Sequence, residues 1–205
     1  MPLVKKRNKS GAPFWVTLAG AMGIVAGLTG CVTQVRPLQP ETIAISQAGE
    51  GVVLGRLHLL YNGKEQRTGL RYPAELGWWM SKEPEGKRFL VAGLPVDGPF
   101  VLTLPVGRYR IETLVFDDVY GQWRANLPAT FTVDAGCTYV GTWELNFQAG
   151  PFAGQASATV INEVQEMSEV LSRIPHGESC PLARALLEAT AQGNLKLSGR
   201  HGARD

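Results

Sequence analysis

The chain has 205 residues and a formal net charge of +2, from 20 Lys and Arg against 18 Asp and Glu. This length is enough for one domain with a substantial core. Four of the basic residues lie within residues 5–9, and no run or stripe of Lys and Arg follows them, so the composition argues against a nucleic-acid-binding protein.

Residues 1–31 predict an export signal. The basic stretch Lys5-Lys6-Arg7-Asn8-Lys9 precedes an uncharged, mostly apolar run over residues 14–30, which ends in small residues before Cys31. These are the three parts of a secretory signal peptide. The segment Leu28-Thr29-Gly30-Cys31 also resembles the lipobox of bacterial lipoproteins.

That resemblance implies cleavage of residues 1–30, a diacylglyceryl thioether on Cys31 and acylation of the new amino terminus. Two or three acyl chains hold a protein stably on a bilayer, whereas one holds it only marginally. Val32 follows the cysteine, and by the sorting rule of enteric-type bacteria the absence of Asp there indicates the outer membrane, on its periplasmic side. Two alternatives stay open: a short uncleaved membrane helix interrupted by glycines, and an ordinary signal with a coincidental cysteine.

Residues 31–49 predict a lipidated tether, because Pro37 and Pro40 stand among scattered polar residues. Fully extended, such a segment of about 18 residues reaches on the order of 60 Å, so the domain is expected to stand off the membrane. Residues 42–46 alternate in polarity and are also compatible with an edge strand.

Residues 50–147 predict an antiparallel β domain. Turn signals such as Asn62-Gly63 separate short apolar or alternating runs, a spacing typical of a β-sandwich. Strands are expected over residues 52–61, 88–94, 100–104, 108–116, 129–133 and 137–147. The alternation places Tyr109, Ile111, Thr113 and Val115 on one face of a strand, Phe131 and Val133 inward on the next, and Tyr139, Trp143, Leu145 and Phe147 together on the last.

Three segments resemble prealbumin-like and carboxypeptidase-regulatory-like domains: Leu104-Pro105-Val106-Gly107-Arg108-Tyr109-Arg110-Ile111, Phe131-Thr132-Val133-Asp134-Ala135-Gly136 and Tyr139-Val140-Gly141-Thr142. The resemblance implies a mainly β fold, an antiparallel sandwich of the transthyretin or immunoglobulin-like type. Small bacterial lipoproteins carry similar domains. Because such sandwiches host many functions, the resemblance is silent on activity.

Residues 148–192 predict a C-terminal helical segment that packs on the sandwich. A first helical stripe comprises Val160, Val164, Met167, Leu171 and Ile174, and a shorter second one comprises Leu182, Ala185, Leu186 and Ala189. A helix pair that binds a partner is the alternative. Residues 193–205 are polar and glycine-rich and predict a flexible tail.

Cys137 and Cys180 remain once Cys31 is lipidated, an even number that predicts a disulfide in an exported protein. A bridge between them closes a loop of 43 residues, worth roughly 4 kcal/mol in the chain-entropy model. The alternative is a reactive Cys180 thiol beside Pro181 at a helix start.

Trp78 and Trp79 lie in a segment, residues 69–86, that reads as a loop, and Trp123 follows in a predicted hairpin loop. Together they form a candidate contact patch for a partner, a glycan or a lipid headgroup. The alternative is that one ring packs on the sandwich while the other closes a sheet end.

The sequence offers little for catalysis. His58, His176 and His201 have no second ligand at metal spacing, and no nucleophile or phosphate-binding motif occurs. Asp117, Asp118 and Asp134 are loop carboxylates that could hold a Ca²⁺ if they met at one end of the sandwich, but sandwich loops commonly carry such acids as plain solvated turns.

We therefore expect a non-enzymatic, membrane-anchored envelope lipoprotein with a structural or partner-binding role. It is expected to have no catalytic residues, cofactor or metal, and to bind the membrane through its lipid and another envelope protein through its surface. The alternative is a small periplasmic redox protein or hydrolase that uses Cys180 or the loop carboxylates.

Overall fold

The computed structural model describes residues 32–43, 49–65, 75–118, 121–151, 153–175, 177, 180 and 182–198. The predicted signal peptide, Cys31, His176 and His201 lie outside this part of the chain. Within the described ranges, no helix has the length and apolarity needed to cross a membrane.

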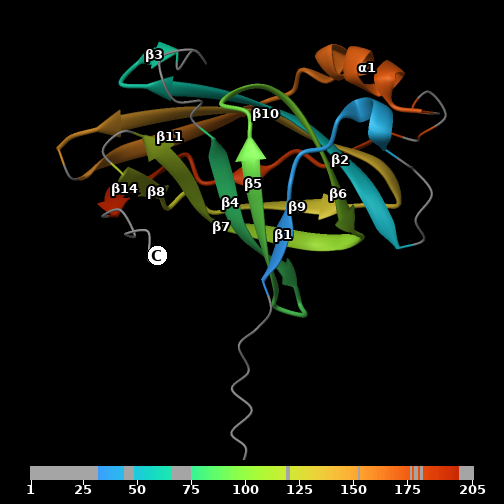
Figure 1. The fold of residues 1–205 in the computed structure, drawn as a ribbon, viewed down its shortest axis with the longest axis horizontal. Helices are drawn as coiled ribbons and strands as arrows, with labels where there is room; N and C mark the ends of the chain where they lie inside the picture. Colours follow the sequence, from blue (N-terminus) through green and yellow to red (C-terminus); the bar gives the residue numbers. More distant parts are fainter. Residues whose placement is uncertain are drawn as a thin grey trace, which may run out of the picture.

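Strands dominate the described residues (Figure 1). In chain order the elements are β1 (Thr33–Val35), the 3₁₀ helix η1 (Pro40–Thr42), β2 (Glu50–Tyr61), β3 (Lys64–Glu65), β4 (Leu76–Glu83), β5 (Lys87–Leu94), β6 (Asp97–Pro105), β7 (Gly107–Asp118), β8 (Gly121–Ala125), β9 (Ala129–Val133), β10 (Gly136–Ala149), β11 (Ala153–Ile161), α1 (Val164–Arg173), β12 (Leu182–Arg184), β13 (Glu188–Ala189) and β14 (Gln192–Ser198).

The described strands belong to one 14-stranded sheet, whose main path runs β1-β5-β4-β7-β8-β14-β11-β10-β2-β3. Most neighbours are antiparallel, while β1 with β5, β10 with β2, and β10 with β12 are parallel. The predicted mainly β fold with mostly antiparallel strands is confirmed.

The sheet curls so that its two halves share one large core. The ring of Trp78 on β4 lies 5.2 Å from that of Phe100 on β6 and 5.6 Å from that of Trp143 on β10. Further along, the rings of Phe116 on β7 and Phe147 on β10 are 5.9 Å apart. The β4–β7 part of the sheet therefore faces the β2–β10 part across these aromatic side chains (Figure 1).

Strand β2 is apolar on both faces because both faces are covered. Val53 and Leu57 enter the large core, whereas Val52 and Leu54 enter a second, smaller core on the opposite side. The predicted Asn62-Gly63 turn into β3 is confirmed, and both of its residues have positive φ, +52° and +72°.

A β-bulge corrects the predicted face of β7. Tyr109 and Ile111 are buried as expected, but Thr113 and Val115 are only partly buried, and Leu114 and Phe116 enter the core instead. In the pairing with β4, consecutive residues Trp79 and Met80 oppose Thr113 and Ile111, so Glu112 is the extra residue. One extra residue moves every later side chain to the other face.

A second bulge divides β10. Trp143, Leu145 and Phe147 share the large core as predicted, but Tyr139 belongs to the smaller core on the other face. The register with β2 shifts between Tyr139 and Thr142, where Gly141 has φ +97°. The predicted common face for all four residues is wrong because the bulge intervenes.

Helix α1 covers the smaller core. Met167 and Val170 of the helix, with Ile174 just after it, pack on Val52 and Leu54 of β2, on Val101 of β6 and on Tyr139. The predicted stripe of Val164, Met167, Leu171 and Ile174 therefore does face the sheet. Val160, assigned to the same stripe, lies in β11.

The rest of the predicted helical segment, residues 148–192, is different. Residues 182–184 and 188–189 form β12 and β13 rather than a second helix, because β12 pairs in parallel with β10 beside Cys137 and β13 pairs with β9. The predicted flexible tail, residues 193–205, is corrected as far as Ser198. Its residues join β14, in which Leu195 is fully buried and Leu197 packs against the core.

The predicted tether, residues 31–49, is also corrected. Strand β1 adds to the edge of β5, the backbone N–H of Leu38 donates to the carbonyl oxygen of Val101 at 2.9 Å, and Ile43 is 3% exposed. Residues 40–42 form η1 rather than a strand, and residues 44–48 lie outside the described ranges. From Thr33 to Ile43 the chain is therefore part of the folded body.

Candidate functional site

The chain enters the folded body beside the lower end of β5 (Figure 1). Thr33 of β1 pairs with Phe89, and Val35 pairs with Val91, in a parallel register. Val32 is the first described residue and is 43% exposed. The candidate lipidation residue Cys31 itself lies outside the described residues, but it is only two positions before β1.

The predicted disulfide is present between Cys137 and Cys180, whose Cα atoms are 5.8 Å apart. Cys137 is 1% and Cys180 8% exposed, and both sulfurs lie within the small core under α1. Because the bridge consumes both thiols, Cys180 is not the free thiolate that a nucleophilic role requires.

The three predicted tryptophans do not form a surface patch. Trp78 is fully buried and Trp123 is 2% exposed, the latter on strand β8 rather than in a hairpin loop. Only Trp79 reaches the surface, because residues 76–83 form a strand and adjacent side chains on a strand point to opposite faces. The guanidinium of Arg88 lies 5.7 Å from the ring centroid of Trp79.

A polar cluster that the sequence analysis did not single out joins α1 to the sheet. The carboxylate of Glu163 accepts a hydrogen bond from the hydroxyl of Thr142 at 2.8 Å, and its backbone N–H donates to the hydroxyl of Tyr139 at 2.8 Å. One turn later, Arg56 of β2 forms an ion pair with Glu166. The cluster fixes the helix and leaves no free nucleophile or base among these groups.

The loop carboxylates do not meet. Asp117 is near the end of β7, whereas Asp134 follows Val133, which pairs with Gly107 at the start of β7. The side chain of Asp118 is outside the described set, and no group of three metal-ligating side chains occurs among the residues that are described. His58 lies 3.2 Å from the carboxylate of Asp97, a single contact at the surface.

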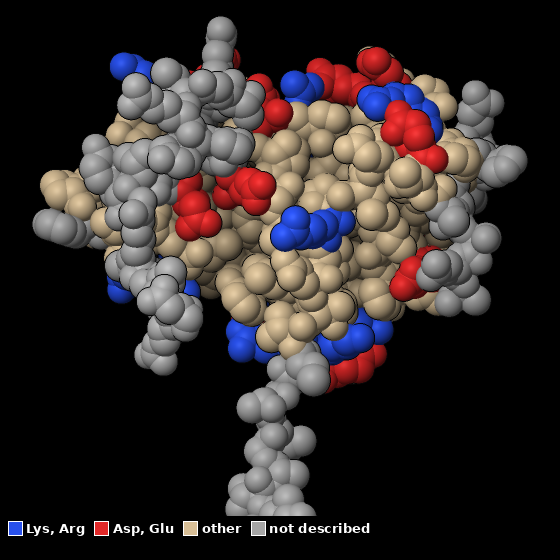
Figure 2. All heavy atoms as spheres, viewed as in Figure 1, with Lys and Arg blue, Asp and Glu red and all other residues tan. Residues whose placement is uncertain are grey.

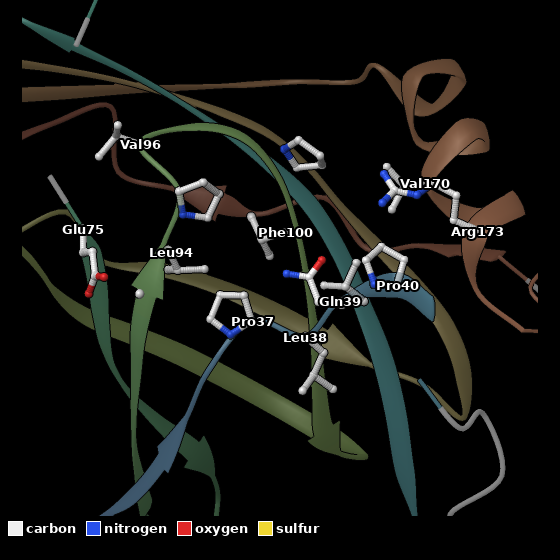
Figure 3. A pocket seen from close by; sticks show the side chains of 14 residues that line it. Pro37, Leu38, Gln39, Pro40, Glu75, Leu94, Val96, Phe100, Val170 and Arg173 are labelled. Atoms are coloured by element: carbon white, nitrogen blue, oxygen red, sulfur yellow. The ribbon is translucent and has the colours of Figure 1, made fainter. Parts of the chain in front are cut away.

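An apolar groove of about 350 Å³ lies at the far end of β5 (Figure 3). It runs between the N-terminal segment, the β5–β6 turn and α1. Its lining residues are mostly proline and aliphatic: Pro37, Leu38, Gln39, Pro40, Glu75, Gly93, Leu94, Pro95, Val96, Pro99, Phe100, Val101, Val170 and Arg173. A volume of this size suits a small ligand or part of an extended segment, with apolar contacts dominant.

Two charged side chains, Arg173 and Glu75, line this groove. Arg173 forms an ion pair with Glu41 of η1, in which Nη2 lies 2.7 Å from Oε1. Glu75 lies on the β4 side (Figure 3). The described lining of the groove therefore offers mainly shape and apolar surface for binding.

A second cavity of about 360 Å³ is polar and lies between β9 and the β12–β13 segment. Arg108 and Arg184 line it, and Glu188 in its wall accepts a hydrogen bond from the hydroxyl of Thr130 at 3.3 Å. Arg108 also contacts Glu83, with Nε 3.4 Å from Oε2. These mixed charges indicate a solvated surface recess.

The sequence matches no protein-family model and no curated protein, and the structure matches no solved structure.

Proposed function

We propose that the protein is a membrane-anchored envelope lipoprotein, cleaved before Cys31 and acylated on it. The observation that carries this proposal is the position of β1, which begins at Thr33, two residues after the lipobox cysteine. Cleavage at this point removes none of the described strands and leaves a complete sheet directly behind the lipid. The proposed processing site thus lies directly before the first described strand.

The Cys137–Cys180 bridge supports an exported location, because stable structural disulfides form mainly in oxidising compartments. Together with Val32 after the cysteine, it favours the outer membrane on its periplasmic side as the location.

Within the mainly β fold, the arrangement of the sheet supports a β-sandwich of the prealbumin-like type. Two halves of the sheet face each other across one core, and the turn glycines of the resembling segments, Gly107 and Gly136, have φ of +149° and +106°. Those values favour glycine at both turns, as the resemblance implies.

The proposed role is non-enzymatic: the body binds or braces another envelope protein. Trp79 with Arg88 on one face, and the apolar groove beside Leu38, are the surfaces that favour such contacts. No observation favours the redox or hydrolase alternative, since the bridge holds Cys180 and the loop carboxylates lie apart.

The anchor is tested by intact-mass spectrometry of the native protein from membranes, compared with a Cys31→Ser variant. The expected mass is that of residues 31–205 plus acyl chains, and the variant should carry none and leave the membrane fraction or remain unprocessed. Thr33→Ser serves as the control, since it changes a nearby residue outside the lipobox. An unmodified Cys31 with residues 1–30 still attached contradicts the proposal.

The partner role is tested with a photo-crosslinking residue in place of Leu38 in the groove or Leu90 beside Trp79, with Lys64 on β3 as the matched exposed control. A discrete adduct from Leu38 or Leu90 and none from Lys64 is expected in intact cells. Equal or absent adducts at all three positions contradict a partner contact on these surfaces.

A further inference from the structure

The first described segment, residues 33–43, is fixed to the rest of the body. Three kinds of contact hold it: the β1–β5 pairing, the Leu38–Val101 backbone hydrogen bond and the ion pair of Glu41 with Arg173. At about 3.3 Å per residue, the Cα atom of Cys31 lies no more than about 7 Å from that of Thr33. A lipid on Cys31 is therefore attached almost directly to this end of the sheet.

Two turns, β4–β5 and β6–β7, form the end of the sheet that lies next to Thr33. The β4–β5 turn contains Glu85, and Lys87 at the start of β5 lies in register with Lys82 of β4. The β6–β7 turn places Val106, which is 36% exposed, beside Gly107. Figure 2 shows Lys and Arg side chains at this lower end of the molecule, among acidic ones.

The β6–β7 turn is held rigidly. The backbone N–H of Val106 donates to the carbonyl oxygen of Gly49 at 2.9 Å, and the hydroxyl of Tyr109 donates to the carbonyl oxygen of Pro105 at 2.6 Å. Burial, with smaller contributions from Glu85 and Glu50, raises the pKa of Tyr109, so its hydroxyl keeps the proton that makes this bond.

From this geometry we infer that the body rests on the bilayer surface with the β4–β5 and β6–β7 turns against the phospholipid headgroups. The inference rests on the proposed lipidation of Cys31, but it adds the membrane-contacting surface and the orientation. Lys87 is the side chain that meets lipid phosphates, and Val106 meets the headgroup boundary. The ion pairs of Lys82 with Glu85 and Arg88 with Glu112 balance the charge, so the contact is set by the attachment point and requires no anionic lipid.

This orientation places the apolar groove away from the membrane. Strand β5 runs from Lys87 at the membrane end to Leu94 in the groove wall. Seven steps at about 3.3 Å each separate these residues by roughly 23 Å. The groove and α1 then face the aqueous compartment at a fixed distance from the membrane. A flexible tether would have allowed that distance to vary.

The experiment uses the lipidated full chain with a fluorophore on one introduced cysteine. Glu85→Cys and Val106→Cys report on the proposed contact turns, and Lys64→Cys on β3 and Glu169→Cys on α1 are exposed controls at sites distant from the anchor. Each protein is reconstituted into phosphatidylcholine vesicles that contain a lipid with a headgroup-attached quencher. The labels at residues 85 and 106 are expected to be quenched, and those at 64 and 169 are not.

A flexible Gly-Ser spacer inserted between Val32 and Thr33 should abolish the quenching at residues 85 and 106 while the protein stays on the vesicle. Equal quenching at all four positions, or quenching that the spacer leaves unchanged, overturns the inferred orientation. Intact mass on the same samples separates the two proposals. A lipidated protein with unquenched turns overturns only the orientation, and a protein without lipid overturns the anchor and the orientation together.

Discussion

The hydroxyl oxygen of Tyr139 accepts a hydrogen bond from the backbone N–H of Glu163 at 2.8 Å, which joins β10 to the start of α1. Glu163 is the N-cap residue of the helix and has no side-chain cap of its own. Its carboxylate instead accepts the Thr142 hydroxyl. Tyr139 and Thr142 reach the same residue because the intervening bulge keeps both on the α1 side of the sheet.

Removing this hydroxyl should therefore loosen the helix. We expect Tyr139→Phe to lower the free energy of unfolding by about 1 kcal/mol, because the N–H of Glu163 loses its partner. Thr142→Val should cost roughly 2 kcal/mol, since its bond is to a carboxylate. Urea unfolding of both single variants and the double variant measures this, and strictly additive losses would contradict a shared cluster around Glu163.

Gly141 allows the bulge, and an alanine there should be costly. Its φ is +97°, and an added Cβ would lie 2.8 Å from Cγ1 of Val160 and 3.3 Å from the carbonyl oxygen of Ile161. Gly141→Ala is expected to cost about 3 kcal/mol or more, from backbone strain plus overpacking.

The matched control for that variant is Gly63→Ala. Gly63 has a similar φ of +72° but nothing within 4 Å of the added Cβ. Its substitution should cost only about 1 kcal/mol, from the backbone alone. Thermal or urea unfolding compares the two, and equal losses would show that the space around Gly141 is not restrictive.

The disulfide should contribute a large share of stability because it joins β10 to the segment after α1. The double variant Cys137→Ala/Cys180→Ala is expected to lower the free energy of unfolding by about 4 kcal/mol. The loss arises because the unfolded chain is no longer constrained by the 43-residue loop that the bridge closes. Thiol labelling of the wild type should be absent before reduction and reach both residues after it. Fast labelling of Cys180 without reductant would revive the redox hypothesis.

The Glu41–Arg173 contact should give a small pH dependence to the packing of the N-terminal segment. A backbone hydrogen bond at Glu41, followed by the Arg173 side chain, holds the pKa of this carboxyl below its usual value. A lowered folded-state pKa contributes stability above the unfolded pKa, and that contribution is lost as the pH falls through the folded value. The contribution is small because solvent screens this surface ion pair, whose Glu41 side chain is 53% exposed.

Glu41→Gln should therefore be slightly less stable than wild type near neutral pH and equal to it in acid below the folded pKa. Glu169→Gln, an exposed glutamate on α1, is the control. Unfolding midpoints across this pH range test the prediction. A difference between wild type and Glu41→Gln that grows as the pH falls has the wrong sign for this mechanism.

Much of the β domain could be predicted from local pattern. The alternating apolar run of β2, its Asn62-Gly63 turn and the inward Phe131 and Val133 of β9 are signals contained within a few residues, and all were correct. The bridge followed from counting cysteines in an exported chain.

Long-range pairing explains what local pattern could not. The spacing of Leu182, Ala185 and Leu186 fits a helix, but the neighbouring bridge and the parallel ladder with β10 hold residues 182–184 as a strand. Strand β11 was missed because its small and polar residues give little alternation. The bulge at Glu112 has no glycine to mark it, whereas Gly141 marks the bulge in β10.

The two hypotheses for the adjacent tryptophans differ for a related reason. A contact patch requires Trp78 and Trp79 together at the surface, but neighbours on a strand point to opposite faces. The burial of Trp78 agrees with the alternative in which one ring packs in the core. Likewise, the prolines at 37 and 40 were read as a tether. They lie instead in a segment whose backbone bonds to β5 and β6, and no local feature reveals those partners.

The same substitution at the two adjacent tryptophans should separate core from surface. Trp78→Leu is expected to cost about 3 kcal/mol or more, because a fully buried ring between Phe100 and Trp143 is replaced by a smaller side chain. Trp79→Leu should cost less than about 1 kcal/mol, since the ring is partly exposed. Urea unfolding measures both.

A third variant tests the indole nitrogen itself. The Nε1 of Trp78 is buried and has no hydrogen-bond partner among the described residues, which is an unfavourable state for a donor. Trp78→Phe removes that donor together with some volume, so its loss should be well below that of Trp78→Leu, at about 1 kcal/mol. A Trp78→Phe loss well above about 1 kcal/mol would contradict an unpaired nitrogen and indicate a partner such as an enclosed water.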